Sequence, residues 1–154
     1  MFIIVEGPDG AGKTTLIKKL QAQFPNSKYL HFGVPEEPTK QYEMYLHAIE
    51  TAGKYSDIII LDRCWYSDMV YAPIMRGTED VTVATSRKLD AAIITYGGGI
   101  VIYCTAPIDV LWERCQTRGE DYVKDIETLQ KLSQAYTAVM KQSLLPVITF
   151  NTAE

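Results

Sequence analysis

Cysteine and histidine are scarce in this sequence, and their placement excludes several kinds of site. The three cysteines, Cys64, Cys104 and Cys115, are odd in number and lack the paired spacing of metal ligands. They indicate packing thiols in a reducing compartment rather than a disulfide framework, so we expect a cytoplasmic protein. Because His31 and His47 are the only histidines, a multi-histidine metal site is excluded.

Long apolar runs and an excess of positive charge are also missing. No apolar run approaches membrane-spanning length, and the opening apolar residues lack a cleavable signal pattern. The net charge of −4 and the pI of about 5.2 argue against a protein that grips a nucleic-acid backbone, since such binding needs basic surface. We therefore expect neither a membrane nor a nucleic-acid partner. Linkers and repeats are lacking too, which predicts a single domain over residues 1–154.

A glycine-rich loop near the start of the chain lies between a predicted strand and a predicted helix. Residues 7–14 satisfy the pattern GxxxxGK[ST], and the β-branched and aromatic run 2–5 precedes them. Glycines let the backbone fold closely around an anion, and the following helix directs its free N–H groups at phosphates. Lys13 is predicted to reach the β and γ phosphates of ATP, and Thr14 to offer its hydroxyl to Mg²⁺. The predicted nucleotide contacts are Gly7, Asp9, Gly10, Ala11, Gly12, Lys13, Thr14 and Thr15.

Strand and helix patterns alternate along the rest of the chain. Short apolar runs predict strands at 2–5, 28–32, 57–61, 100–104 and 147–150. Helical periodicity predicts helices at 13–24, 42–53, 64–75, 82–96, 107–117 and 125–142, with Gly53 ending the second. This alternation predicts an α/β fold, a parallel sheet with helices on both faces.

A second group of polar residues follows the third predicted strand. Asp62 emerges at the carboxyl end of that strand, where ligands bind in open α/β sheets. Arg63, Ser67 and Tyr71 are spaced to share one face of a helix. A cation, a hydroxyl and an aromatic ring on one face suit an anionic, hydrogen-bonding, aromatic ligand.

These two segments resemble thymidylate kinases and their compact phage-encoded relatives over nearly the whole chain. The loop matches the family's EG-x-DGAGKTT pattern, and Asp62, Arg63, Ser67 and Tyr71 match its DR-x-x-x-S-x-x-x-Y spacing. The resemblance implies a three-layer P-loop fold with strand order 2-3-1-4-5, and a homodimer. It also implies an ATP- and Mg²⁺-dependent kinase acting on a thymidylate-type deoxynucleoside monophosphate.

The resemblance also implies roles for single residues. Asp9 would contact the acceptor's sugar hydroxyl, Arg63 would hold its phosphate, and Asp62 would assist Mg²⁺ through water. Ser67 and Tyr71 would lie near the acceptor's sugar or base.

The helix predicted at 107–117 resembles the family's helix that leads into a lid, here around residues 114–125. Arg114 and Arg118 lie four residues apart and would neutralise charge on the transferred phosphoryl group, or stack on the donor adenine. Tyr122 stands where many relatives carry a further lid arginine.

The loop after the second predicted strand departs from the family, because residues 31–39 contain no arginine to hold an acceptor phosphate. Glu37-Pro38 and Tyr66-Ser67-Asp68 instead resemble segments of deoxynucleoside kinases, whose glutamate acts as a base on a sugar hydroxyl. Deoxynucleoside phosphorylation, with Glu37 at the substrate, therefore stays open. A P-loop regulator without kinase activity and a kinase of polynucleotide ends are further alternatives, the last disfavoured by the acidic balance.

Overall fold

The protein is described by a computed structural model that covers residues 1–55, 57–119 and 122–154. Five parallel strands form one sheet in the order β2-β3-β1-β4-β5, which confirms the predicted topology. The strands are β1 (Phe2–Glu6), β2 (Lys28–His31), β3 (Ile59–Asp62), β4 (Gly99–Thr105) and β5 (Val147–Asn151).

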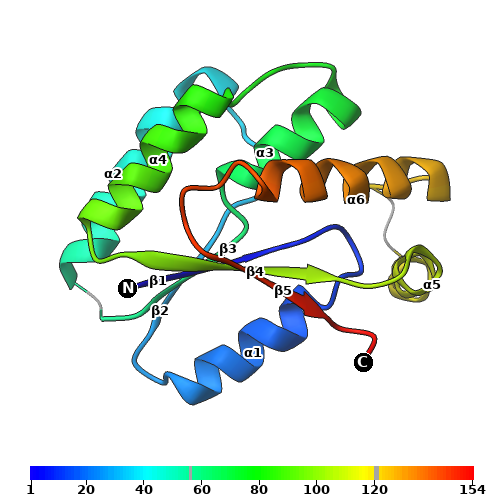
Figure 1. Ribbon diagram of the computed structural model, residues 1–154, viewed down its shortest axis with the longest axis horizontal. Helices are drawn as coiled ribbons and strands as arrows, with labels where there is room; N and C mark the ends of the chain where they lie inside the picture. Colours follow the sequence, from blue (N-terminus) through cyan, green and yellow to red (C-terminus); the bar gives the residue numbers. More distant parts are fainter. Residues whose placement is uncertain (56, 120–121) are drawn as a thin grey trace.

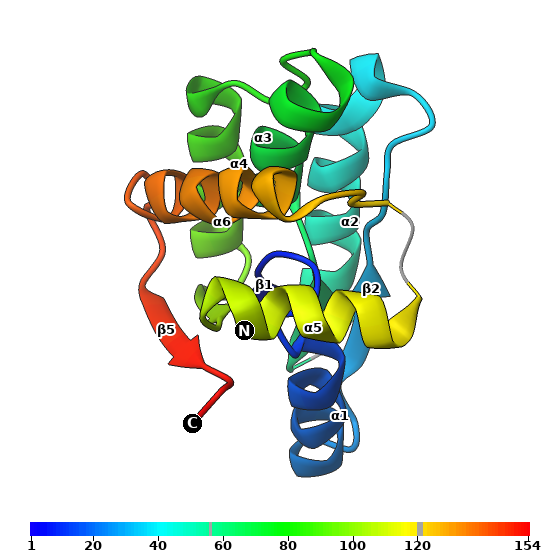
Figure 2. The same ribbon diagram turned by 90° about the vertical axis from the view of Figure 1, so that its right-hand side faces the viewer.

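Helices cover both faces of this sheet, as the alternation predicts. Figures 1 and 2 show α1 on one side and α2, α3, α4 and α6 on the other, while α5 lies at the end of the sheet where the strands finish. The α-helices are α1 (Lys13–Gln23), α2 (Gln41–Tyr55), α3 (Trp65–Tyr71), α4 (Val83–Thr95), α5 (Ile108–Arg118) and α6 (Ile126–Met140). A short 3-10 helix, η1 (Pro38–Lys40), precedes α2.

The core is built around β1, the middle strand. All of its residues are buried because it pairs with β3 on one side and β4 on the other, and helices cover both of its faces. Four of these residues are apolar, and the fifth is Glu6, a carboxylate with no exposed surface at the carboxyl end of the strand. The buried carboxylate of Glu6 therefore lies directly before the start of the glycine loop.

Gly53 does not end the second helix, contrary to the prediction, because α2 continues to Tyr55. A Cβ at Gly53 would lie 3.0 Å from the Cβ of Tyr96. The glycine therefore allows α2 to approach the chain just after α4, and close packing rather than a helix stop explains it.

The helix predicted at 64–75 is also interrupted. It divides into α3 and a π-helical turn, η2 (Ala72–Arg76), which contains Pro73. Proline has no N–H to donate, so regular α-helical bonding is interrupted there, and the wider turn carries Arg76 to the end of the segment.

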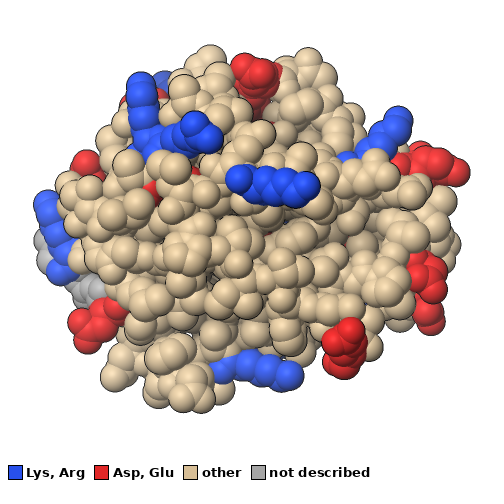
Figure 3. All heavy atoms as spheres, viewed as in Figure 1, with Lys and Arg blue, Asp and Glu red and all other residues tan. Residues whose placement is uncertain are grey.

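One face of the surface (Figure 3) carries charges of both signs without a large patch of either. On the face shown in Figure 3, lysine, arginine, aspartate and glutamate side chains are scattered among neutral residues. Within the described ranges, no helix combines the length and apolarity needed to cross a bilayer.

We expect Leu89→Ala to lower the free energy of unfolding by about 3 kcal/mol, because Leu89 of α4 is fully buried in the core. Ile94→Ala on the same helix is the matched control; that side chain is 55% exposed, and we expect a change below about 0.5 kcal/mol. Urea unfolding followed by circular dichroism measures both. Equal destabilisation by the two substitutions would contradict this description of the core.

Candidate functional site

The glycine loop wraps around the start of α1 at the carboxyl end of β1. Gly7 has a φ of 151°, and a Cβ there would lie 2.4 Å from the carbonyl oxygen of Cys104. Only glycine fits this close approach to β4. The turn directs the chain back so that α1 begins at Lys13 with its free N–H groups at the loop.

Lys13 is held over the loop. Its ammonium donates hydrogen bonds to the carbonyl oxygens of Gly7 at 3.0 Å and Pro8 at 3.1 Å. Burial of the ammonium, followed by the nearby positive charge of Arg63, lowers the pKa of Lys13 to about 8. Thr14 and Thr15 are exposed in the first turn of α1.

Glu6 joins the glycine loop to the residues that follow β3. Its carboxylate accepts hydrogen bonds from the backbone N–H groups of Cys64 at 2.9 Å and Ser67 at 3.1 Å. The hydroxyls of Ser67 and Tyr136 also donate to it, at 2.8 Å and 3.0 Å. A buried carboxylate is costly unless such donors satisfy it, so this network fixes β1, α3 and α6 relative to one another.

Arg63 lies above this network and outside helix α3. It precedes α3 and adopts a φ of 68°, a left-handed conformation that is uncommon for any residue except glycine. The prediction that it shares a helix face with Ser67 and Tyr71 is therefore wrong, although the three side chains do converge. Nη1 of Arg63 donates to the Gly7 carbonyl at 3.2 Å, Ser67 Oγ at 3.0 Å and the Tyr136 hydroxyl at 2.8 Å.

The other amino group of Arg63 makes long contacts with two side chains of the described residues. Nη2 lies 3.5 Å from the Tyr71 hydroxyl and 3.6 Å from a carboxylate oxygen of Asp9. The Tyr71 hydroxyl donates to Asp9 at 2.9 Å. Arg63 is thus anchored through one nitrogen and presents the other beside Asp9 of the glycine loop.

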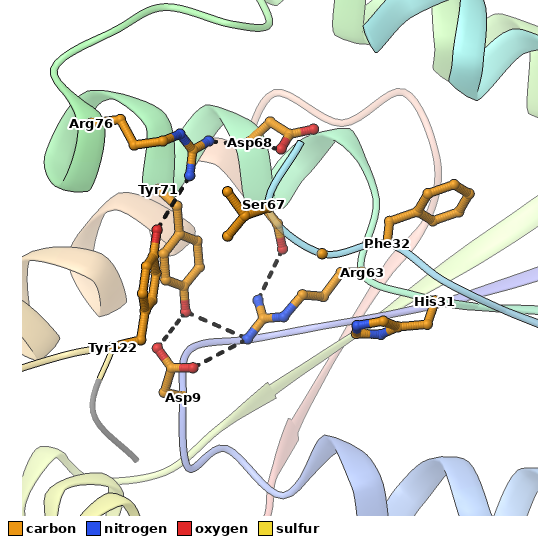
Figure 4. A pocket seen from close by; sticks show the side chains of 11 residues that line it. Asp9, His31, Phe32, Arg63, Ser67, Asp68, Tyr71, Arg76 and Tyr122 are labelled. Atoms are coloured by element: carbon orange, nitrogen blue, oxygen red, sulfur yellow. Dashed lines mark hydrogen bonds and ion pairs between the residues drawn. The ribbon is translucent and has the colours of Figure 1, made fainter. Parts of the chain in front are cut away.

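These side chains line a pocket at the carboxyl ends of β1, β2 and β3 (Figure 4). Tyr122 lies over Tyr71, with the two ring centres 6.0 Å apart, and donors and acceptors from several elements face the space between. The lining residues are Asp9, His31, Phe32, Gly33, Val34, Arg63, Ser67, Asp68, Tyr71, Arg76 and Tyr122.

Asp68 and Arg76 form one end of this pocket (Figure 4). Burial raises the pKa of Asp68 to about 6, although hydrogen bonds from Tyr45 and Gln41 favour its charged form. The Arg76 guanidinium lies 3.2 Å from Asp80 and 4.0 Å from Asp68. Its Nε is buried and has no hydrogen-bond partner among the described residues.

Asp62, the predicted metal residue, lies at the end of β3 and has partners of its own. The Tyr29 hydroxyl donates to its Oδ2 at 2.6 Å, and His31 Nδ1 lies 3.2 Å from the same oxygen. Oxygen donors from Thr14 and Asp62 suit Mg²⁺, which is commonly held by one or two protein oxygens together with substrate phosphates. In the described part of the chain, no cluster of three or more histidine, cysteine or acidic side chains is arranged to hold a metal ion.

Glu37 lies apart from the pocket that contains Arg63. It is exposed and pairs with Lys40 at 2.8 Å. It lines a neighbouring hollow that shares residues 31–34 with the main pocket. The structure therefore places Glu37 beside the candidate site without bringing its carboxylate to Arg63 or Asp9.

Arg114 and Arg118 of α5 line a hollow together with Gly12 and Thr15, on the outer flank of the glycine loop. A second hollow that includes both arginines is lined by α5 residues alone. Arg114 donates to the Gly10 carbonyl at 3.1 Å and the Thr152 hydroxyl at 2.8 Å. Of the lid predicted around 114–125, residues 120 and 121 lie outside the described residues, and Tyr122 beyond them receives a hydrogen bond from Arg76 at 3.3 Å.

Sequence reasoning missed four contributors to this site: Glu6, Tyr136, Arg76 and Thr152. Glu6 carries a signal, because a charged residue closing a buried strand needs partners. Tyr136 follows the helical spacing of the buried apolar residues of α6, so its position in the sequence does not indicate that its hydroxyl reaches Glu6. Thr152 is distant in sequence from the glycine loop that it contacts. Arg76 is near Asp68 in sequence but lies beyond the matched segment, which ends at Tyr71.

The chain matches no protein-family model and no curated protein. It does match solved structures. The YorR protein of Bacillus subtilis, crystallised in complex with phosphorylated GDP, is 24% identical with a TM-score of 0.81, covering 100% of this chain and 87% of that one. Deoxyadenosine kinase of M. mycoides, with dCMP and dCDP bound, is 18% identical with a TM-score of 0.63, covering 100% and 92%.

A third match, polyphosphate kinase 2 of Arthrobacter aurescens, is 15% identical with a TM-score of 0.76, and the match covers 96% of this chain and 59% of that one. At these identities the likeness concerns the fold. The chain therefore has the fold of the P-loop kinases, and its resemblance to thymidylate kinases in particular stays a prediction.

Proposed function

We propose that this protein is an ATP-dependent kinase that phosphorylates a deoxynucleoside monophosphate of the thymidylate type. The observation that carries the proposal is the placement of Arg63. One of its amino groups is anchored on the glycine loop and Tyr136, and the other is presented to the pocket beside Asp9. An arginine held in this way suits a phosphate close to the loop that would grip ATP.

The donor half of the site follows from the glycine loop. Backbone N–H groups and the start of α1 would hold the β and γ phosphates, with Lys13 turning from the Gly7 and Pro8 carbonyls to meet them. Thr14 and Asp62 would hold Mg²⁺, whose charge would offset that of the phosphates. Arg114 and Arg118 would lie near the donor nucleotide.

The acceptor half uses the pocket of Figure 4. Asp9 would accept a hydrogen bond from the sugar hydroxyl, and Arg63 Nη2 would contact the monophosphate. Arg76 Nε has no hydrogen-bond partner within the described part of the chain, and the Arg76 guanidinium lies 4.0 Å from Asp68, which offers an acceptor. A thymine edge offers a carbonyl oxygen next to an N–H group, which complements this pair.

Transfer to a monophosphate needs little acid–base chemistry. The attacking phosphate oxygen is already ionised at neutral pH, so catalysis depends on alignment and on offsetting negative charge. Arg63 and Lys13 are the cations placed at this junction. The homodimer and the cytoplasmic location expected from the sequence belong to the same proposal.

Deoxynucleoside phosphorylation is the second candidate, because the hollow lined by Glu37 adjoins the pocket. A nucleoside hydroxyl needs a base, and Glu37 could serve after leaving Lys40. The likeness to deoxyadenosine kinase in fold agrees with this candidate.

An acceptor panel separates the candidates. With ATP and Mg²⁺, we expect ADP release to rise at least about tenfold more with a pyrimidine deoxynucleoside monophosphate than with any deoxynucleoside, because Arg63 contributes only to the former. A coupled spectrophotometric assay follows ADP, and Lys13→Ala should reduce turnover at least about 100-fold. Turnover with nucleosides but not with monophosphates would refute the leading proposal.

Glu37→Gln tests the same choice from the protein side. If the acceptor is a monophosphate, kcat should change less than about threefold, because no base is needed. Glu36→Gln is the matched control in the same loop, and kcat and KM are measured for both variants. A loss of about 100-fold or more confined to Glu37→Gln would favour the nucleoside candidate.

Nucleotide binding should weaken at alkaline pH. Burial lowers the pKa of Lys13 to about 8, so its charge is largely present at pH 7 and largely lost at pH 9. Since the charged form binds phosphate, we expect the Kd for ADP to rise about tenfold between these values. Calorimetric titration of the wild type and of Lys13→Ala measures it. A flat wild-type profile, or a parallel rise in the variant, would contradict this role of Lys13.

A further inference from the structure

The outer side of the glycine loop is held by Thr152, which follows β5, and by Arg114 of α5. The Thr152 hydroxyl donates to the Ala11 carbonyl at 2.8 Å, and its backbone N–H donates to the Thr105 carbonyl of β4 at 2.9 Å. Arg114 donates to the Gly10 carbonyl at 3.1 Å. Two consecutive carbonyls of the loop are therefore fixed on the side facing Thr152 and Arg114.

The two holding residues are also bound to each other. Arg114 Nη1 donates to the Thr152 hydroxyl at 2.8 Å, and Nη2 donates to the Thr152 carbonyl at 3.1 Å. Figure 1 shows how this arises: the chain leaves β5 close to both α5 and the start of α1. The contact joins three segments that are far apart in sequence.

The absence of a side chain at Gly12 leaves room for Thr152. A Cβ at Gly12 would lie 3.2 Å from both Cβ and Cγ2 of Thr152, and the residue has a φ of 85°. Gly12 is thus required both by its conformation and by the close approach of Thr152.

The consequence for the loop follows from peptide geometry. In a planar trans peptide the C=O and the following N–H point in opposite directions. With the Ala11 carbonyl held outward by Thr152, the Gly12 N–H is turned toward the inner side of the loop, where a phosphate would bind.

We infer that Thr152, together with Arg114, is a positioning residue for nucleotide phosphate, acting through the peptide groups of Gly10, Ala11 and Gly12. This inference rests on the proposed nucleotide site. It assigns Thr152 a role that acts through the loop, and it gives Arg114 a second role beside the donor.

The test compares ADP binding by Thr152→Val, which keeps the shape but removes the donor, with binding by Thr152→Ser, which retains the hydroxyl. Loss of one oriented hydrogen bond should raise the Kd for ADP about fivefold in Thr152→Val, while Thr152→Ser stays within about twofold of the wild type. Thr149→Val, on the exposed part of β5, is the matched control and should bind like the wild type.

Calorimetry at 25 °C gives each Kd, and thermal unfolding gives the stability of each variant. Unchanged ADP affinity in Thr152→Val, even with a lowered Tm, would overturn the inference, because a merely structural residue behaves in that way. Thr152→Ala also lacks the donor. If Thr152→Val does not fold, Thr152→Ala must show the same loss of ADP affinity. A wild type that fails to bind ADP overturns the nucleotide site and this inference together, whereas ADP binding without turnover refutes only the kinase proposal.

Discussion

The buried carboxylate of Glu6 is the constraint on which the rest of the site depends. It closes the central strand, has no exposed surface, and accepts hydrogen bonds from the turn after β3, from Ser67 and from Tyr136 of α6. A buried charge of this kind is tolerated only when its donors stay in place. Because the glycine loop begins at the next residue, the same network that satisfies Glu6 also sets the distance between the loop and the pocket.

The hydrogen-bond network around Glu6 also positions the guanidinium of Arg63. Its left-handed backbone turns the guanidinium back over β1, where Nη1 lies between the Gly7 carbonyl and two hydroxyls that also contact Glu6. The strained conformation persists because these contacts fix it. The remaining amino group faces Asp9 and Tyr71 with long contacts, as expected of a donor that is shared with a ligand.

Most of the fold could be predicted from the sequence, because buried strands and amphipathic helices carry strong periodic signals and the resemblance to thymidylate kinases implies the strand order. Two local departures from regular helices could not be predicted. Gly53 permits helix packing and Pro73 gives a π-helical turn, yet both residue types ordinarily signal a helix end. In the site, the loop motif and the convergence of Arg63, Ser67 and Tyr71 were predictable. The roles of Tyr136 and Thr152 were not, since long-range hydrogen bonds leave no local pattern in sequence.

In the proposed function, the glycine loop and the Arg63 pocket together transfer a phosphoryl group from ATP to a monophosphate. Phosphorus NMR of the wild-type protein with ATP, Mg²⁺ and thymidine monophosphate tests it most directly, since the method identifies which molecule receives the phosphoryl group. We expect signals of thymidine diphosphate and ADP to grow together as the monophosphate signal falls. Release of inorganic phosphate alone, with the monophosphate unchanged, would contradict it.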